Sequence, residues 1–171
     1  MKQEELFNSG VLTEHCPGAV LPPISLWEKK KGGFAVIECP KRIPCNPCAT
    51  SCPTGAVLPF EDINDTPRID YEKCTGCGKC VARCPGLACF VIDLTYGGED
   101  QALISMPYEL LPVPEKGGTV ACLDRIGRVV AEGLVTAVRE PWKDQTRVVS
   151  VVIPRTLAEE IRGCKVVNGN G

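Results

Sequence analysis

Two groups of cysteines in this chain share one spacing, and that spacing suits the binding of metal clusters. Residues 74–85 read Cys-x2-Cys-x2-Cys-x3-Cys-Pro. Residues 45–53 repeat this pattern without its leading cysteine, because Arg42 stands in that place. The full run is the bacterial pattern for two iron–sulfur clusters, in which the fourth cysteine of a run binds the other cluster. The cysteines therefore predict one-electron transfer as the chemistry of this chain.

The crossing of the fourth cysteines divides the predicted ligands into two sets. We expect the second cluster to be held by three cysteines of the second run and the last cysteine of the first run: Cys74, Cys77, Cys80 and Cys52. We expect the first cluster to take Cys45, Cys48 and Cys84, which leaves one of its positions open. The predicted cofactors are two [4Fe–4S] clusters.

Cys39 is the predicted fourth ligand of the first cluster. It precedes Cys45 by six positions, so its loop is longer than the standard one, and Pro40 and Pro44 stiffen that loop. Cys16 is the alternative ligand. A first cluster with only three irons is the remaining outcome.

Zinc and disulfides explain the cysteine spacing less well. A structural zinc site places ligands around one small tetrahedral ion, commonly as separated pairs, whereas three cysteines here recur at every third position. Disulfide frameworks belong to secreted chains, and residues 1–7 do not read as a signal peptide because acids come early with no apolar run behind them. Of the other cysteines, we expect Cys89 to pack as a small hydrophobic residue near a cluster, and Cys122 and Cys164 to belong to the core.

Composition argues against several other classes of function. The 171 residues carry a formal net charge of −2, so no strongly basic surface and no nucleic-acid partner are expected. No apolar segment approaches the about 20 residues that span a membrane, and free thiols favour a cytoplasmic location. His15 is the only histidine, and the glycine motifs of dinucleotide and phosphate sites are absent. We therefore expect no catalytic residues and no enzyme activity of the chain's own.

The elements that must position the cysteines are short strands and turns. Residues 1–33 are punctuated by Pro and Gly and predict an extended N-terminal arm. Residues 34–96 contain both cysteine groups, with strands expected at 34–38, 68–71 and 90–94. Residues 97–171 predict a small β-rich docking domain, with strands expected at 102–106, 119–123, 128–138 and 147–153. A capping box, Thr156 to Glu159, predicts a C-terminal helix over 155–162.

Residues 39–94 resemble the two-[4Fe–4S] bacterial ferredoxins through the two cysteine runs described above. Together with the strand runs and the capping box after residue 97, this resemblance predicts an α+β fold, in which a ferredoxin-like two-cluster domain precedes a small antiparallel sheet or barrel with a C-terminal helix. The early position of Cys39 departs from the ferredoxin pattern.

The wider chain resembles the small iron–sulfur subunits of multi-subunit flavin dehydrogenases. The resemblance lies in residues 37–48 and in the tail, over residues 123–127 and 151–154. It implies an electron-transfer subunit in a hetero-oligomeric complex, with FAD-containing dehydrogenase subunits that oxidise amino acids such as proline, hydroxyproline or opines. A free-standing soluble ferredoxin with an extra domain is the alternative, and a structural zinc module is a third.

Overall fold

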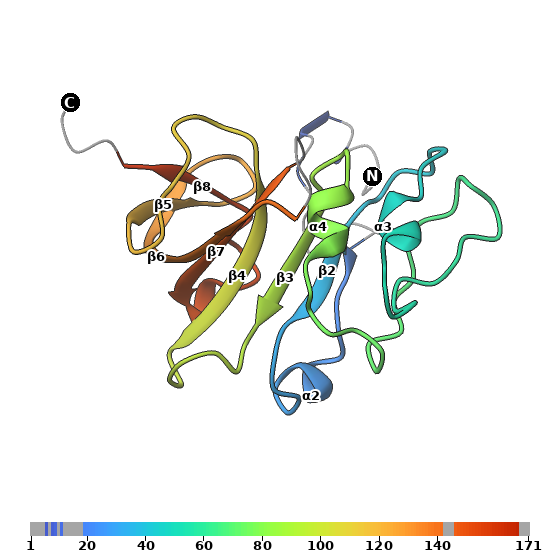
Figure 1. The fold of residues 1–171 in the computed structure, drawn as a ribbon, viewed down its shortest axis with the longest axis horizontal. Coiled ribbons are helices and arrows are strands. Elements are labelled where there is room, and N and C mark those ends of the chain that lie inside the picture. Colours follow the sequence, from blue (N-terminus) through green and yellow to red (C-terminus); the bar gives the residue numbers. More distant parts are fainter. Residues whose placement is uncertain (1–5, 7, 10, 12–18, 142–145, 168–171) are drawn as a thin grey trace.

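A single antiparallel sheet of eight strands forms the framework of this protein (Figure 1). The structure is a computed structural model that describes residues 6, 8–9, 11, 19–141 and 146–167. The strands lie in the order β1-β2-β3-β4-β7-β6-β5-β8. Their bounds are β1 Ala19–Val20, β2 Phe34–Glu38, β3 Cys89–Asp93, β4 Gln101–Tyr108, β5 Thr119–Leu123, β6 Val129–Arg139, β7 Arg147–Pro154 and β8 Gly163–Val166.

The helices are short and lie on the side of the sheet that carries the cysteine runs. They are α2 (Ile24–Trp27), α3 (Pro47–Thr50) and α4 (Lys79–Arg83). A 3-10 turn, η1, covers Arg155–Leu157. Such short helices leave most of the stabilisation to packing against the sheet, because a single turn is unstable alone.

Strands β2 and β3 frame the cysteine-rich part of the chain. Both are runs of apolar and β-branched residues, which suit a strand covered on both faces. Every residue of β2 is buried, and the two strands pair antiparallel, with Phe34 opposite Ile92. The strand expected at 68–71 is reduced to one bridge, between Val57 and Ile69. This segment turns again at once, where the Asp70 carboxylate accepts the backbone N–H of Glu72.

The strands expected after residue 97 coincide with β4, β5, β6 and β7. The sheet also crosses the proposed boundary between the two domains, because β3 pairs with β4, with Val91 opposite Ser105. The division at residue 97 therefore stays a prediction about folding units, since strands on both sides of it share one sheet.

The prediction of a C-terminal helix over 155–162 is wrong. The structure has the 3-10 turn η1 there, without a side-chain cap, followed by strand β8. Ala158 and Ile161 are buried, and the backbone N–H of Arg162 donates to the carbonyl of Leu123. Burial of these side chains and pairing of β8 with β5 outweigh the local capping signal.

The second half of the predicted N-terminal arm is part of the core. Trp27 is 2% exposed, and its indole Nε1 donates to the carbonyl oxygen of Ile92 at 3.2 Å. The Lys30 ammonium donates to the carbonyl oxygens of Tyr71, Glu72 and Cys74. This part of the arm therefore covers one edge of the cysteine region. His15 and the alternative ligand Cys16 lie outside the described residues.

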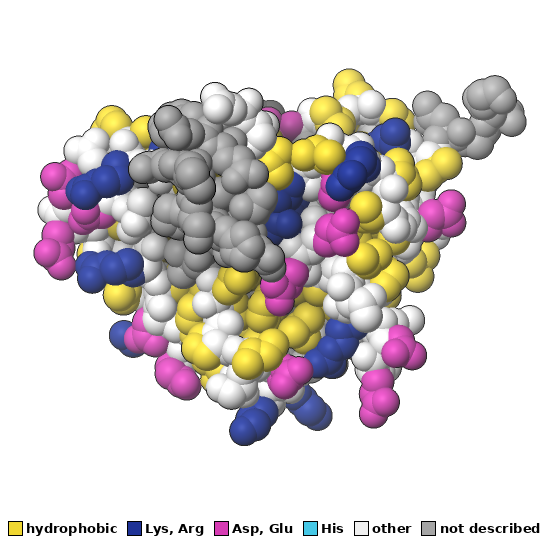
Figure 2. Space-filling view, turned by 180° about the vertical axis from the view of Figure 1, so that it is seen from behind, with side chains coloured by type: hydrophobic (Ala, Val, Ile, Leu, Met, Phe, Trp, Pro, Cys, Tyr) yellow, Lys and Arg dark blue, Asp and Glu magenta, His cyan; other side chains and the backbone are white. Residues whose placement is uncertain are grey.

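Charged side chains of both signs are interspersed over the face opposite the view of Figure 1 (Figure 2). This mixture of signs agrees with the formal net charge of −2, and hydrophobic side chains are exposed between the charges. In the part of the chain that the structure describes, no helix has both the length and the apolar character needed to cross a membrane.

A buried ion-pair cluster joins the end of β2 to the C-terminal strands. The Glu38 side chain, 7% exposed, accepts hydrogen bonds from Arg125, at 2.6 and 3.1 Å, and from Arg162 Nε at 2.7 Å. Burial alone would raise the pKa of Glu38, but the hydrogen bonds and positive charges of both arginines outweigh it and hold the pKa below its usual value. The cluster therefore fixes the residue that immediately precedes Cys39.

We expect Glu38→Gln to destabilise the protein by about 3–5 kcal/mol, because the substitution leaves the buried Arg162 guanidinium without its counter-charge. Urea unfolding of the cluster-loaded protein would measure this loss. Glu61→Gln is the matched control, because the Glu61–Arg68 pair is exposed and such pairs contribute about 0–1 kcal/mol. Equal stability losses in the two variants would contradict the expectation.

Candidate iron–sulfur centres

The cysteines of the two runs line two separate cavities. One cavity is lined by Cys52, Cys74, Cys77 and Cys80. The other is lined by Cys39, Cys45, Cys48, Cys84 and Cys89. Apart from Cys89, these groups are the two ligand sets that the sequence predicts from crossed fourth cysteines. The structure thus brings each predicted set together.

The two short helices α3 and α4 place cysteines of one run at both cavities. Helix α3 carries Cys48, which faces the first cavity, and the turn after it carries Cys52, which faces the second. Helix α4 repeats this arrangement in the opposite direction, with Cys80 at the second cavity and Cys84 at the first. Each cavity is therefore built from both halves of the repeat, and neither half can form its site alone.

Strand β2 positions Cys39 at the first cavity. Cys39 follows Glu38, the last residue of the strand and the acid held by two arginines. The charges of Cys45 and Cys84 both act on Cys39 and raise its pKa, after the larger contribution of burial. The longer loop between Cys39 and Cys45 thus still brings the three sulfurs into mutual electrostatic range.

The arrangement of the sulfurs suits a cluster better than a single ion. In the described ranges, no three His, Cys, Asp or Glu side chains converge closely enough to hold one metal ion. Zinc requires its sulfur ligands at about 2.3 Å from one point. A cubane instead presents four irons, each bound by one cysteine thiolate, so its sulfur ligands stand further apart.

Burial works against the thiolate form of most of these cysteines. It raises the pKa of Cys48 to about 12 and also raises the pKa of Cys39, Cys45 and Cys74. Since thiolates are the form that binds metal, the positive charge of bound iron must offset this desolvation. The cavities therefore suit positively charged contents and would resist collecting thiolates without them.

Cys80 and the two crossed cysteines are exceptions, because hydrogen bonds lower their pKa further than burial raises it. Burial raises the pKa of Cys52, but N–H donors that include Val57, at 3.4 Å from Sγ, lower it further than burial raises it. The pKa of Cys84 falls to about 6, first through a hydrogen bond from Cys89 and then through backbone donors that include Ala88. Hydrogen bonds to cluster sulfurs are one of the levers that set reduction potential.

The same backbone turn follows both crossed cysteines. Gly55 and Leu87 occupy corresponding positions of the repeat, and both have a left-handed backbone, with φ of 65° and 52°. Leucine rarely adopts this conformation. The sequence repeat is thus a repeat of backbone geometry as well.

A glycine allows the loop of the second cavity to approach the N-terminal segment. Gly76 lies between Cys74 and Cys77 with φ of +65°, and a Cβ there would lie 2.3 Å from the carbonyl oxygen of Gly33. The following turn is held by Arg139, whose Nη1 donates to the Cys77 carbonyl at 3.3 Å. Cys77 is the exposed cysteine of this set, so the second cavity reaches the surface there.

The two predicted core cysteines and Cys89 are all buried, but of these three Cys89 alone lines a cluster cavity. Cys122 and Cys164 lie opposite each other on β5 and β8 and line neither cluster cavity. Cys89 is buried too, and it lines the first cavity beside Cys84. In the first copy of the repeat, the position that corresponds to Cys89 holds Val57, so the repeat already singles out Cys89 as a departure.

Comparison with known proteins identifies the cofactors. Residues 41–88 match a family model described as a 4Fe-4S dicluster domain. This region is therefore a dicluster iron–sulfur domain, and its cofactors are two [4Fe–4S] clusters, as the cysteine spacing predicts. The assignment of individual cysteine ligands stays a prediction.

Several curated proteins are similar to part of the chain. One subunit of an ion-translocating oxidoreductase complex from Methanosarcina acetivorans is 49% identical over 43 residues, which are 25% of this chain and 15% of that protein. One selenate reductase subunit from Mesobacillus selenatarsenatis is 46% identical over 77 residues, covering 40% of this chain and 24% of the relative. Pyruvate synthase subunit PorD of Methanocaldococcus jannaschii is 38% identical over 50 residues, 29% of this chain and 56% of the relative.

These similarities cover part of each protein only. The chain spans less than a fifth of the length of the first two curated relatives, at 15% and 11%. No solved structure matches the chain.

We expect Cys39→Ala to lower the iron content of the first cluster or convert it to a three-iron form, because one of its four sulfurs is removed. Iron analysis and EPR of the isolated protein would measure the change. Cys164→Ala is the control, since Cys164 is buried but lines neither cavity. Full iron in Cys39→Ala would show that another residue completes the first cluster.

We also expect Gly76→Ala to displace the loop of the second cavity and deplete its iron, because the new Cβ would meet the backbone of Gly33. Gly55→Ala is a closely matched control, with the same φ of +65° and open space around its Cβ. That control should cost only the about 1–2 kcal/mol of left-handed backbone strain and retain its iron. Iron analysis of both variants tests this, and equal iron loss would exclude the clash as the cause.

Proposed function

We propose that this chain is an electron-transfer subunit of an oxidoreductase complex. When bound, each [4Fe–4S] cluster takes up and releases one electron at a time. The observation that carries the proposal is the pair of cavities built across each other through Cys52 and Cys84. Each half of the repeat contributes to both cavities, so the two sites form one rigid unit suited to passing electrons between them.

The names of the relatives support a subunit rather than an independent carrier. The similar proteins include subunits of an ion-translocating oxidoreductase complex and of selenate reductase, and an electron transfer subunit of thiosulfate reductase. Each of these proteins matches part of this chain. The same role for this chain is the simplest inference from those matches and from the dicluster domain over residues 41–88.

The partner that we propose is an FAD-containing dehydrogenase subunit, and a second acceptor receives the electrons. A reduced flavin releases two electrons, whereas each cluster accepts one, so two adjacent clusters can take both in succession. The sequence resemblance to subunits of flavin dehydrogenases is the support for this choice. A cytoplasmic location belongs to the same proposal, because it keeps thiols reduced for cluster assembly.

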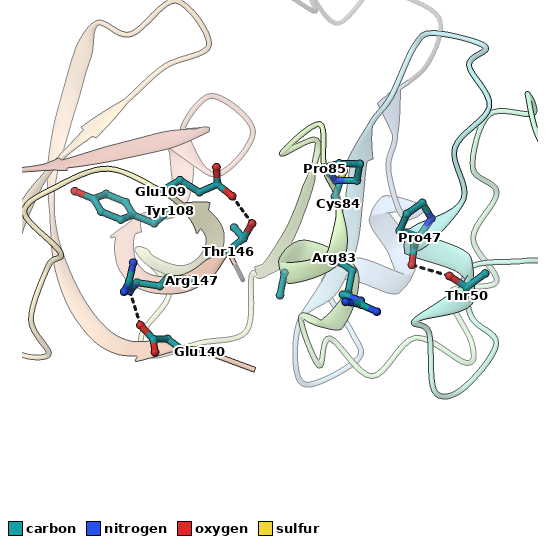
Figure 3. A pocket seen from close by; sticks show the side chains of 11 residues that line it. Pro47, Thr50, Arg83, Cys84, Pro85, Tyr108, Glu109, Glu140, Thr146 and Arg147 are labelled. Atoms are coloured by element: carbon teal, nitrogen blue, oxygen red, sulfur yellow. Dashed lines mark hydrogen bonds and ion pairs between the residues drawn. The ribbon is translucent and has the colours of Figure 1, made fainter. Parts of the chain in front are cut away.

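The β-rich part of the chain offers a surface for such a partner beside the first cavity. A broad groove runs between Cys84 and Pro85 on one wall and Tyr108, Glu109 and Arg147 on the other (Figure 3). Leu110 and Leu111 follow directly and are 57% and 84% exposed. Exposed apolar side chains next to a polar groove are typical of protein contact surfaces. We propose that residues 97–171 dock the partner here, close to the first cluster.

The test is isolation of the chain with its partners from the native host. We expect a flavin-containing protein to co-purify, and the dehydrogenase substrate to reduce the clusters of the complex. A double variant, Leu110→Ser with Leu111→Ser, should reduce co-purification, whereas Val167→Ser, an exposed apolar residue after β8, should not.

Three results would contradict the proposal. A chain isolated alone, without a flavoprotein, would support the free-standing ferredoxin instead. Two zinc ions without sulfide would support a structural metal module. A flavoprotein that is unaffected by the double substitution would place the docking surface elsewhere.

A further inference from the structure

Arg139, the last residue of β6, contacts the loop that carries predicted ligands of the second cavity. Its Nη1 donates to the carbonyl oxygen of Cys77 at 3.3 Å. The guanidinium comes from a part of the chain 62 residues away from Cys77 and outside the dicluster domain of residues 41–88. The β-rich part of the chain therefore touches a predicted cluster ligand directly.

A β-bulge in β6 sets the face on which Arg139 lies. The register of β6 against β7 shifts between Val135 and Ala137, where Thr136 is the extra residue. One extra residue moves all later side chains of a strand to the other face of the sheet. After the bulge, Arg139 lies opposite Val148 of β7, and residues directly opposite each other share a face. The bulge therefore puts the Arg139 and Val148 side chains on the same face.

Gly78 leaves room for both of these side chains. A Cβ at this position would lie 3.1 Å from Arg139 Nη2 and 3.8 Å from Val148 Cγ1. Gly78 has φ of +77° and is the N-cap of α4, the helix that carries Cys80. Val148 is fully buried, so this end of the β6–β7 pair is packed against the loop. The guanidinium thus has a defined place on the loop, although the Arg139 side chain as a whole is exposed.

The positive charge of Arg139 lies close enough to act on the second cluster. The neighbouring carboxylate of Glu140 pairs with Arg147, and no ion pair to Arg139 is found among the residues that the structure describes. The carbonyl oxygen and Sγ of Cys77 belong to one residue, so covalent geometry keeps them within about 5 Å of each other. The guanidinium nitrogen therefore lies within about 9 Å of that sulfur, inside the screening length of about 10 Å at 0.1 M salt.

We propose that Arg139 is a positioning residue of the second cluster, whose guanidinium acts through Cys77 and raises the reduction potential of that cluster. A cluster gains negative charge when it is reduced, so a nearby positive charge stabilises the reduced form. The proposal rests on the predicted ligand role of Cys77 and on the electron-transfer role proposed above, but on no particular partner. Cys77 is the exposed cysteine of its set. A raised potential therefore draws electrons toward the cavity that reaches the surface there.

The test uses Arg139→Gln, which removes the charge and keeps an N–H donor. We expect about eight irons per chain to remain, because Arg139 is not a ligand. In an EPR-monitored titration of the isolated protein, we expect one of the two reduction potentials to become more negative. The potential that moves should be the one that Cys77→Ser also alters or abolishes. Added salt should reduce the difference between Arg139→Gln and the unaltered protein, because salt screens an exposed charge.

Two further variants complete the test. Arg139→Lys keeps the positive charge and should keep the potential closer to that of the unaltered protein than Arg139→Gln does, which a purely structural contact would not produce. Lys165→Gln removes one positive charge from an exposed position on β8, an edge strand that β5 separates from β6. This control should leave both potentials unchanged.

Four outcomes would overturn the proposal. Unchanged potentials in Arg139→Gln with full iron would show that the guanidinium does not act on a cluster. Loss of about four irons would show that Arg139 holds the loop together instead. A shift confined to the cluster that Cys77→Ser leaves intact would show that the contact does not act through Cys77. An equal shift in Lys165→Gln would show that only the net charge of the chain matters.

Because the titration uses the isolated protein, its result does not depend on whether a flavoprotein partner is found.

Discussion

Burial of sulfur ligands inside a small protein is the constraint on which this structure depends. A thiolate loses its hydration when it is buried, and this loss raises the pKa of Cys48 to about 12. A cavity of four such groups is unfavourable unless positive charge or hydrogen-bond donors stabilise it. Iron supplies the charge, and the backbone turns after Cys52 and Cys84 supply donors. Much of the fold serves to hold these turns and the loops around them.

The sheet provides the rigidity that these loops lack. The cysteine loops contain only two one-turn helices, α3 and α4, which would not be stable alone. Strands β2 and β3 fix the two ends of the region, and β3 continues into β4 and the remaining strands. The Glu38 ion pairs extend this connection from the start of the first cavity to Arg125 and Arg162, near the C-terminal strands. The β-rich part is thus mechanically joined to the cluster region, so the docking surface that we propose would stand at a fixed distance from the clusters.

Electron transfer depends on how the two sites communicate as well as on where they lie. The crossing of Cys52 and Cys84 makes each cavity from both halves of the repeat. Cys89 is buried and lines the first cavity beside Cys84. The two halves differ at this point, with Val57 in one and Cys89 in the other, so the two clusters have unequal surroundings. Unequal surroundings give unequal potentials, which favour movement of electrons in one direction through a relay.

The sequence by itself determined the cofactor chemistry and most strands of the sheet, and it predicted the two crossed cysteine sets that line the two cavities. These features follow from local spacing, because cysteines at every third position and alternating or continuous apolar runs can be recognised within a few residues. Only the tertiary structure decided that the sheet crosses residue 97, that a 3-10 turn over Arg155–Leu157 precedes β8, and that Cys89 lines the first cavity beside Cys84. Each of these depends on contacts between residues far apart in the sequence or on the direction of one side chain. Local patterns do not encode such contacts, because the free energy of burial is set by the neighbours that folding brings together.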